Sequence, residues 1–214
     1  MRIHSTIFSA SIPLVFLLVT SGCSDETPAA RGPAARAPSV SATQAEPETQ
    51  KQYAVSKSSD DQAFAECGGI RFAKPATWNW VRPTVQFRTL QYAVPGTDGV
   101  GDAELIFSVF NDQDGGPTDA NLDRWAGQFR IVDGTPPREA RSMREVNDTT
   151  VWFIELEGAY AGMGAAAPRS GTAQLGAIIE APDRRVFIRL LGPAKTVLEN
   201  KAAFESMINS LQAE

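Results

Sequence analysis

Residues able to do nucleophilic or metal chemistry are scarce in this sequence. The 214 residues include one histidine, His4, and two cysteines, Cys23 and Cys67. A Ser-His-Asp or Cys-His unit needs a histidine beside the nucleophile, and a zinc site needs several thiolates or imidazoles. The segment that holds His4 has the layout of a removable leader, so the mature chain would contain no histidine. We therefore expect no such nucleophile and no metal site.

Paired carboxylates are the remaining catalytic option. Glu155 and Glu157 would point to the same side of a strand and could serve as acid and base on an envelope polymer. The loop NDQDGGPTDANLD places Asp112, Asp114 and Asp123 as in an EF-hand count, but its glycines are displaced and its last residue is Asp, not Glu. A carboxylate-dependent enzyme and a small-ligand or calcium-binding module are the alternatives to a protein without catalytic activity.

The charge of the chain argues against a nucleic-acid partner. The formal net charge is -5 and no run of Lys or Arg occurs, whereas phosphate contacts need a basic patch. The glycines between residues 162 and 171 match neither GxGxxG nor a P-loop, and no lysine stands beside them. We expect no nucleic acid and no cofactor.

The N-terminus has the pattern of a secretory signal peptide over residues 1–22. Arg2 precedes the apolar run Ile12–Val19, and small residues follow it. The run is too short to span a bilayer, which takes about 20 apolar residues. We expect this segment to be cleaved rather than to remain as an anchor.

The string VTSGC ends at Cys23 and resembles the lipobox of bacterial lipoproteins. The resemblance implies cleavage before Cys23 and acyl chains on that residue, which would hold the mature protein at a membrane. Ser24 in the next position favours the outer membrane, facing the periplasm, if the host is Gram-negative. The alternative is a soluble secreted protein in which Cys23 is incidental.

A change in composition divides the remaining chain at about residue 62. Residues 23–62 are rich in Ala, Pro, Ser, Thr, Gln and Glu, with Tyr53 as the only aromatic residue. Such a segment buries too little apolar surface to offset its ordering entropy. We expect a disordered tether over 23–62 and a globular domain over 63–214.

Apolar patterning in the domain predicts strands, a helix, more strands and a closing helix. Leu122, Trp125 and Phe129 recur at helical spacing after Thr118, which with Asp119 could cap that helix. Strands are expected near residues 70–72, 85–94, 104–110, 138–146, 151–160, 173–180 and 185–191, and a last helix from Gly192-Pro193 to Leu211. This order predicts an α+β domain with a mainly antiparallel sheet flanked by helices.

The opening IRFAKPATWNW and the ending VFIRLLGPAKTVLENKAAFESMINSL resemble the PsbP-like fold, which a photosystem extrinsic protein shares with a Ran-binding protein of the Mog type. The likeness covers about Phe64 to Leu211 and implies an α/β/α sandwich. The metal-binding histidines of that family have no counterpart here, so no metal role carries over.

Two groups of residues are candidates for contact with a partner. Tyr160 precedes the small-residue loop Gly162–Gly171, and Met163 and Arg169 lie within it; together they combine a ring, a thioether and a charge. Trp78 and Trp80 lie in an irregular segment where partial exposure is expected. The alternative for the loop is a mobile linker without a role.

Two single residues have structural interpretations. Arg189 lies inside an apolar strand and needs a carboxylate or carbonyl partner if it is buried, with anion binding as the alternative. Cys67 is expected to be partly buried and inert, although a lone thiol could also pair with another chain. Together the observations favour a membrane-anchored envelope lipoprotein whose PsbP-like domain is a non-enzymatic protein-interaction or assembly module.

Overall fold

A computed structural model describes residues 52–111 and 114–213 of the chain. The predicted signal peptide, Cys23 and most of the predicted tether lie outside the described residues, as does Asp112. No helix among the described residues is both long and apolar enough to cross a membrane.

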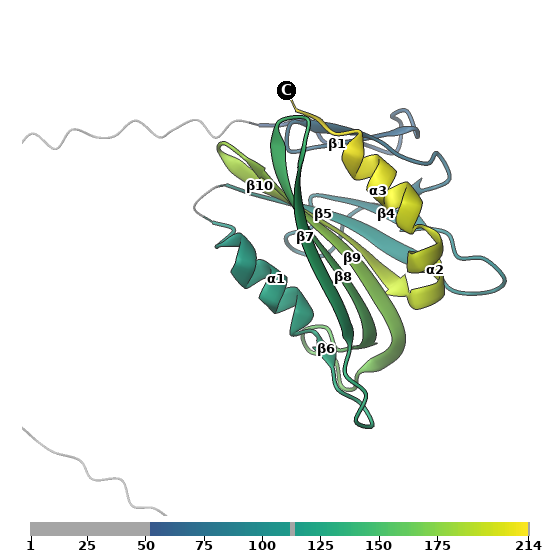
Figure 1. The fold of residues 1–214 in the computed structure, drawn as a ribbon. Helices are drawn as coiled ribbons and strands as arrows, with labels where there is room; N and C mark the ends of the chain where they lie inside the picture. The colour runs from purple at the N-terminus through teal and green to yellow at the C-terminus, as the bar shows by residue number, and fades with distance from the viewer. Residues whose placement is uncertain (1–51, 112–113, 214) are drawn as a thin grey trace, which may run out of the picture. The chain divides into compact units, whose positions relative to one another are not determined.

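An antiparallel sheet of eight strands forms the centre of the described part (Figure 1). Its order is β3-β4-β5-β10-β9-β8-β6, and β7 also pairs with β8. The strands are β3 Asn79–Trp80, β4 Leu90–Val94, β5 Ala103–Asn111, β6 Phe129–Arg130, β7 Arg138–Val146, β8 Thr149–Tyr160, β9 Arg169–Ala181 and β10 Arg184–Pro193. A smaller sheet joins β1 Phe64–Cys67, β2 Ile70–Ala73 and β11 Gln212–Ala213.

Helices cover both faces of the large sheet (Figure 1). On one face lies α1 (Thr118–Ala126), and on the other lie α2 (Ala194–Glu199) and α3 (Lys201–Asn209). Because side chains alternate along a strand, each central strand contributes to two cores. In β10, Ile188 belongs to the core under α2 and α3, while Phe187 belongs to the core under α1. The predicted α+β class with a mainly antiparallel sheet is therefore confirmed.

Turn chemistry explains two of the hairpins. Asn147 and Asp148 both have positive φ, 48° and 60°, which the two-residue turn between β7 and β8 requires and which Asn and Asp tolerate. Pro182 and Asp183 connect β9 to β10, which lies between β9 and β5. The strands of both hairpins were predicted from the sequence.

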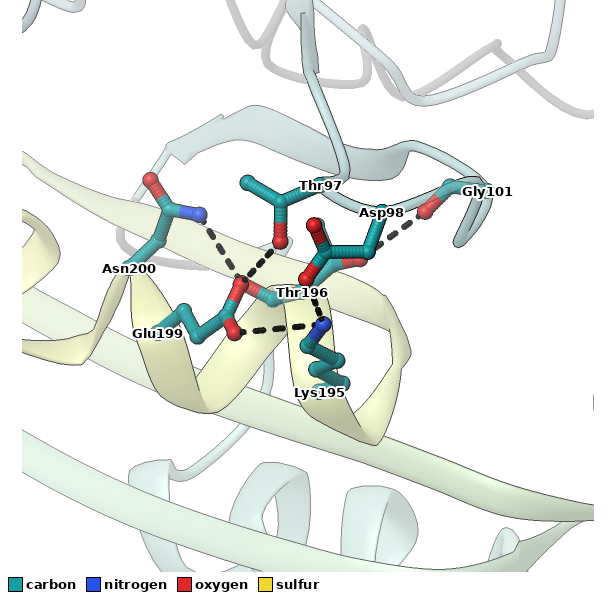
Figure 2. Close-up of polar contacts among 7 residues, drawn as sticks. All are labelled: Thr97, Asp98, Gly101, Lys195, Thr196, Glu199 and Asn200. Atoms are coloured by element: carbon teal, nitrogen blue, oxygen red, sulfur yellow. Dashed lines mark hydrogen bonds and ion pairs between the residues drawn. The ribbon is translucent and has the colours of Figure 1, made fainter.

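The loop between β4 and β5 is held against α2 (Figure 2). The buried Thr196 hydroxyl donates to the Gly101 carbonyl at 2.9 Å, and Thr97 donates to the Glu199 carboxylate at 2.8 Å. Lys195 of α2 pairs with Asp98 at the tip of the same loop. These contacts hold the β4-β5 loop against α2, which directly follows β10.

Three elements differ from the sequence predictions. The strand expected over 85–94 begins only at Leu90, because residues 81–89 form a loop in which Phe87 has a φ of 66°. Phe129 belongs to β6, since α1 ends at Ala126 and Gly127 follows as its C-cap. Pro117 is the N-cap of α1, where no side chain caps the helix, and Asn200 divides the closing helix into α2 and α3.

The packed part of the chain also starts before residue 63. Residues 52–62 are described, and Ser56 pairs with Glu66 through Ser56 N to Glu66 O at 3.0 Å and Glu66 N to Ser56 Oγ at 2.8 Å. The Tyr53 hydroxyl donates to Asp183 at 2.7 Å in the β9-β10 turn. The packed domain thus begins before the predicted boundary at residue 63. The polar composition of residues 52–62 gave no sign of these contacts.

Cys67 is fully buried in β1 and forms no disulfide with a described residue. Burial raises the pKa of its thiol to about 12, so the thiol stays protonated at neutral pH. The buried position agrees with the expected structural role.

Candidate functional site

A groove of about 480 Å³ lies on the α1 face of the large sheet. Its floor comes from β5 and β10, one wall from α1, and the rims from the loop before β4 and the segment that follows β8. The lining residues are Val85, Gln86, Phe87, Arg88, Ile106, Ser108, Phe110, Arg124, Trp125, Gln128, Tyr160, Gly162, Met163, Phe187, Arg189 and Leu191. A volume of this size is within the range of ligand sites.

The rim exposes large apolar side chains. Phe87 is 66% exposed and Met163 is fully exposed, with Val85 beside Phe87 also in solvent. A phenylalanine with φ of 66° is in the left-handed region that a bulky side chain rarely adopts. Strained backbone of this kind is concentrated at binding and active sites. An exposed aromatic ring on such a strained backbone indicates a contact surface.

A row of aromatic rings continues from the rim along the groove. Phe87 contacts Phe110 with 5.9 Å between ring centroids, and Phe110 contacts Phe187 edge-on at 5.3 Å. Phe187 contacts Trp125 of α1 at 6.0 Å. The Arg189 guanidinium lies 5.3 Å from the Trp125 ring centroid, so the aromatic row ends at a cation.

Arg189 is held by neutral groups. Its Nε donates to Gln174 Oε1 at 2.9 Å, and its Nη2 donates to Gln128 Oε1 at 2.7 Å and to Gln174 Oε1. No carboxylate of the described residues forms an ion pair with it, and burial lowers the pKa of its guanidinium. Side-chain carbonyl oxygens are therefore among its partners, together with Tyr160, and a carbonyl partner is one of the two arrangements that the sequence predicted.

The groove is cationic although the chain is acidic. Arg88, Arg124 and Arg189 line it, and no aspartate or glutamate does so among the described residues. Arg88 pairs with Glu104 at 3.1 Å, whereas Arg124 donates to the Asn121 side chain. Two of these three arginines thus have only neutral hydrogen-bond acceptors among the described residues.

Some of the predicted contact residues lie at the groove or next to it. Tyr160 and Met163 line the groove, and Arg169 lines an adjoining hollow that shares Leu191 with it. Trp78 and Trp80 pack with the core on the opposite face of the sheet. The expected exposure of Trp78 was wrong: it is 1% exposed, because it fills that core and its Nε1 donates to Asn200 Oδ1 at 3.3 Å.

Sequence reasoning missed the residues that define the groove most clearly. Phe87 was assigned to a strand, and Arg124 was not among the predicted contact residues. The one available signal was Arg189, a charged residue in the apolar strand Val186–Leu191. Its neighbours in space come from α1 and β9, which the sequence pattern could not bring together.

The carboxylates considered for catalysis, and Asp123 of the calcium candidate, each form an ion pair. Glu155 pairs with Lys201 of α3, and Glu157 with Arg138 at 3.2 Å. Asp123 pairs with Arg141 at 2.8 Å. Across 52–111 and 114–213, no three His, Cys, Asp or Glu side chains gather as a metal site requires.

Comparisons with known proteins bear on the fold. No family model and no curated protein matches the sequence. Similar solved structures include a Pseudomonas aeruginosa protein of unknown function, with TM-score 0.46, 11% identity and coverage of 64% of this chain and 97% of that one. Cyanobacterial PsbP from Synechocystis has TM-score 0.47, 11% identity and coverage of 68% and 87%. A Bacteroides thetaiotaomicron protein has TM-score 0.35, 10% identity and coverage of 68% and 45%.

A PsbP structure is thus among the neighbours in fold. Likenesses at this level carry no inference about function.

Proposed function

We propose that the protein is a lipid-anchored, non-enzymatic protein of the cell envelope whose domain binds a partner protein in the groove beside α1. The observation that supports binding is the exposed Phe87 ring at the rim, whose backbone is held in the left-handed region. Val85 and Met163 are exposed at the same rim. Aromatic residues, Met and Arg are the types enriched in the centres of protein interfaces. All three types line this groove.

The anchoring part of the proposal rests on the sequence VTSGC. Replacing Cys23 with Ala should leave the precursor unlipidated and alter its processing and membrane fractionation, because no thiol would remain there to carry diacylglycerol. Mass spectrometry of the wild-type N-terminus, together with membrane fractionation, is the measurement. A mature N-terminus at any residue other than Cys23 would contradict lipidation.

Partner binding can be tested by photo-crosslinking in native membranes. A photoreactive amino acid at position 87 or 163 should give a discrete adduct, since both side chains point into solvent at the rim. Positions 131 and 143 are matched controls, because Ile131 and Met143 are also exposed apolar residues but do not line the groove. We expect adducts from the rim at least about fivefold more abundant than from the controls.

The adduct should weaken when the opposite rim is changed, for example when Phe87→Ser is combined with a crosslinker at 163. Equal adducts from positions 131 and 143, or none from 87 and 163, would place the binding surface elsewhere. The thermal unfolding midpoint of each variant shows whether a weaker adduct comes from a lost contact or from a domain that no longer folds.

A further inference from the structure

We infer that the groove recognises an extended peptide segment that places one carboxylate between apolar side chains, with Arg189 as the residue that binds the carboxylate. This inference rests on the proposed function and adds the chemistry of the partner. Its basis is the order of groups along the groove: rings from Phe87 to Trp125, followed by the guanidinium.

A buried donor beside Arg189 lacks an acceptor. Arg189 itself donates through Nε and Nη2 to the amide oxygens of Gln174 and Gln128, and Tyr160 is a further hydrogen-bond partner. Gln174 is fully buried, and its Nε2 has no partner among the described residues. Buried polar groups are nearly always satisfied, so this unused donor next to the guanidinium indicates a missing acceptor. A carboxylate offers two acceptor oxygens and matches the fork of an arginine.

Charge complementarity predicts that the ligand carries a negative charge. The three arginines that line the groove outnumber the one carboxylate paired with them, Glu104, so the local charge is positive within a chain of net charge -5. Desolvation of Arg189 makes a charge-assisted hydrogen bond there stronger than one in open water.

The shape favours an extended segment over a small molecule. The groove shares Arg124, Gln128, Gly162 and Met163 with a hollow of about 660 Å³. It shares Leu191 with a second hollow of about 560 Å³ that includes Arg169. A strand-like peptide advances about 3.3 Å per residue and would continue from the groove into either hollow.

The test compares two peptides that differ only in charge: acetyl-Gly-Leu-Asp-Phe-Gly-amide and its Asn counterpart. Each is titrated into the chain from Ser24 to Glu214, which contains every described residue, and amide chemical shifts report affinity and location. We expect the Asp peptide to bind about tenfold more tightly than the Asn peptide, the size of one charge-assisted hydrogen bond. The shifts should fall on β5, β10 and α1.

Arg189→Gln should reduce the Asp-to-Asn ratio to about one, whereas Arg71→Gln, an exposed arginine of β2 outside the groove, should leave it unchanged. If Arg189→Gln does not fold, Arg124→Gln and a salt titration replace it, since both should reduce the preference for Asp. Equal affinity of the two peptides, or shifts outside the groove, would overturn the inference. In that case crosslinking from position 87 would still support partner binding in the groove, because that experiment does not depend on the charge of the partner.

Laurate serves as the competing occupant. If laurate displaces the Asp peptide and binds more tightly than it, the groove is a site for a fatty acid and the peptide assignment is wrong. Laurate that fails to compete supports the peptide.

Discussion

Deleting residues 52–61 is expected to lower the free energy of unfolding by about 3 to 5 kcal/mol, although their composition is that of a tether. The Tyr53 ring lies 4.1 Å from the guanidinium carbon of Arg184, and its hydroxyl accepts from Arg184 Nη1 at 2.9 Å. Ser56 O accepts from Trp80 Nε1 at 3.1 Å. Deletion would leave a buried arginine and an indole nitrogen without these partners.

Urea unfolding of the chain from Ser24 onward, with and without residues 52–61, measures the loss. The matched control removes ten residues of the predicted tether before residue 52 and should leave the midpoint unchanged. Tyr53→Phe should lose less than Tyr53→Ala, because the phenylalanine keeps the ring against Arg184 and Gly69. An unaltered midpoint after removal of 52–61 would show that these contacts add no stability.

Local patterns predicted the parts of the fold that depend on neighbouring residues. The turn at Asn147-Asp148 was predictable because those residue types tolerate positive φ. The buried stripe of α1 was predictable from the spacing of Leu122 and Trp125, both buried. Hydrophobic alternation identified β8, in which Ile154 and Leu156 face one core.

The groove could not be predicted in the same way, because its exposed rim residues Val85, Phe87 and Met163 do not belong to the core. Val85 and Phe87 alternate as a strand would, and only the positive φ of Phe87 shows that they line a rim. Trp78 was misjudged for the opposite reason, since its partner Asn200 lies 122 residues further along the chain. Burial that depends on such distant pairs leaves no local pattern.

Gly176 is the position where one added methyl group should do most harm to the groove. A Cβ there would lie 2.7 Å from Trp125 Cζ3 and 2.8 Å from Ile154 Cγ2, both well inside van der Waals contact. Trp125 is 2% exposed and touches Phe187, so it has little room to move within the core. α1 therefore packs against β9 at Gly176, where the missing Cβ leaves room for the Trp125 ring.

Gly176→Ala is expected to cost about 2 to 3 kcal/mol of unfolding free energy, because α1 must lift from the sheet to relieve the overlap. Gly101→Ala is the matched control: its nearest neighbour would be Pro193 Cγ at 3.9 Å, so a near-neutral change is expected. Chemical denaturation of both variants, followed by tryptophan fluorescence, is the measurement. Equal stability of the two variants would show that Trp125 moves without cost.

The clash also predicts a second-site rescue. If Trp125 is the obstacle, Trp125→Leu should cost much less in the Gly176→Ala background than in the wild type, giving a coupling energy of about 1 to 2 kcal/mol. Additive losses would instead assign the destabilisation to Ile154 or to the strand itself. Because α1 also carries Arg124, and Gln128 follows it, Gly176→Ala should reduce crosslinking from position 163 even at temperatures where the domain is fully folded.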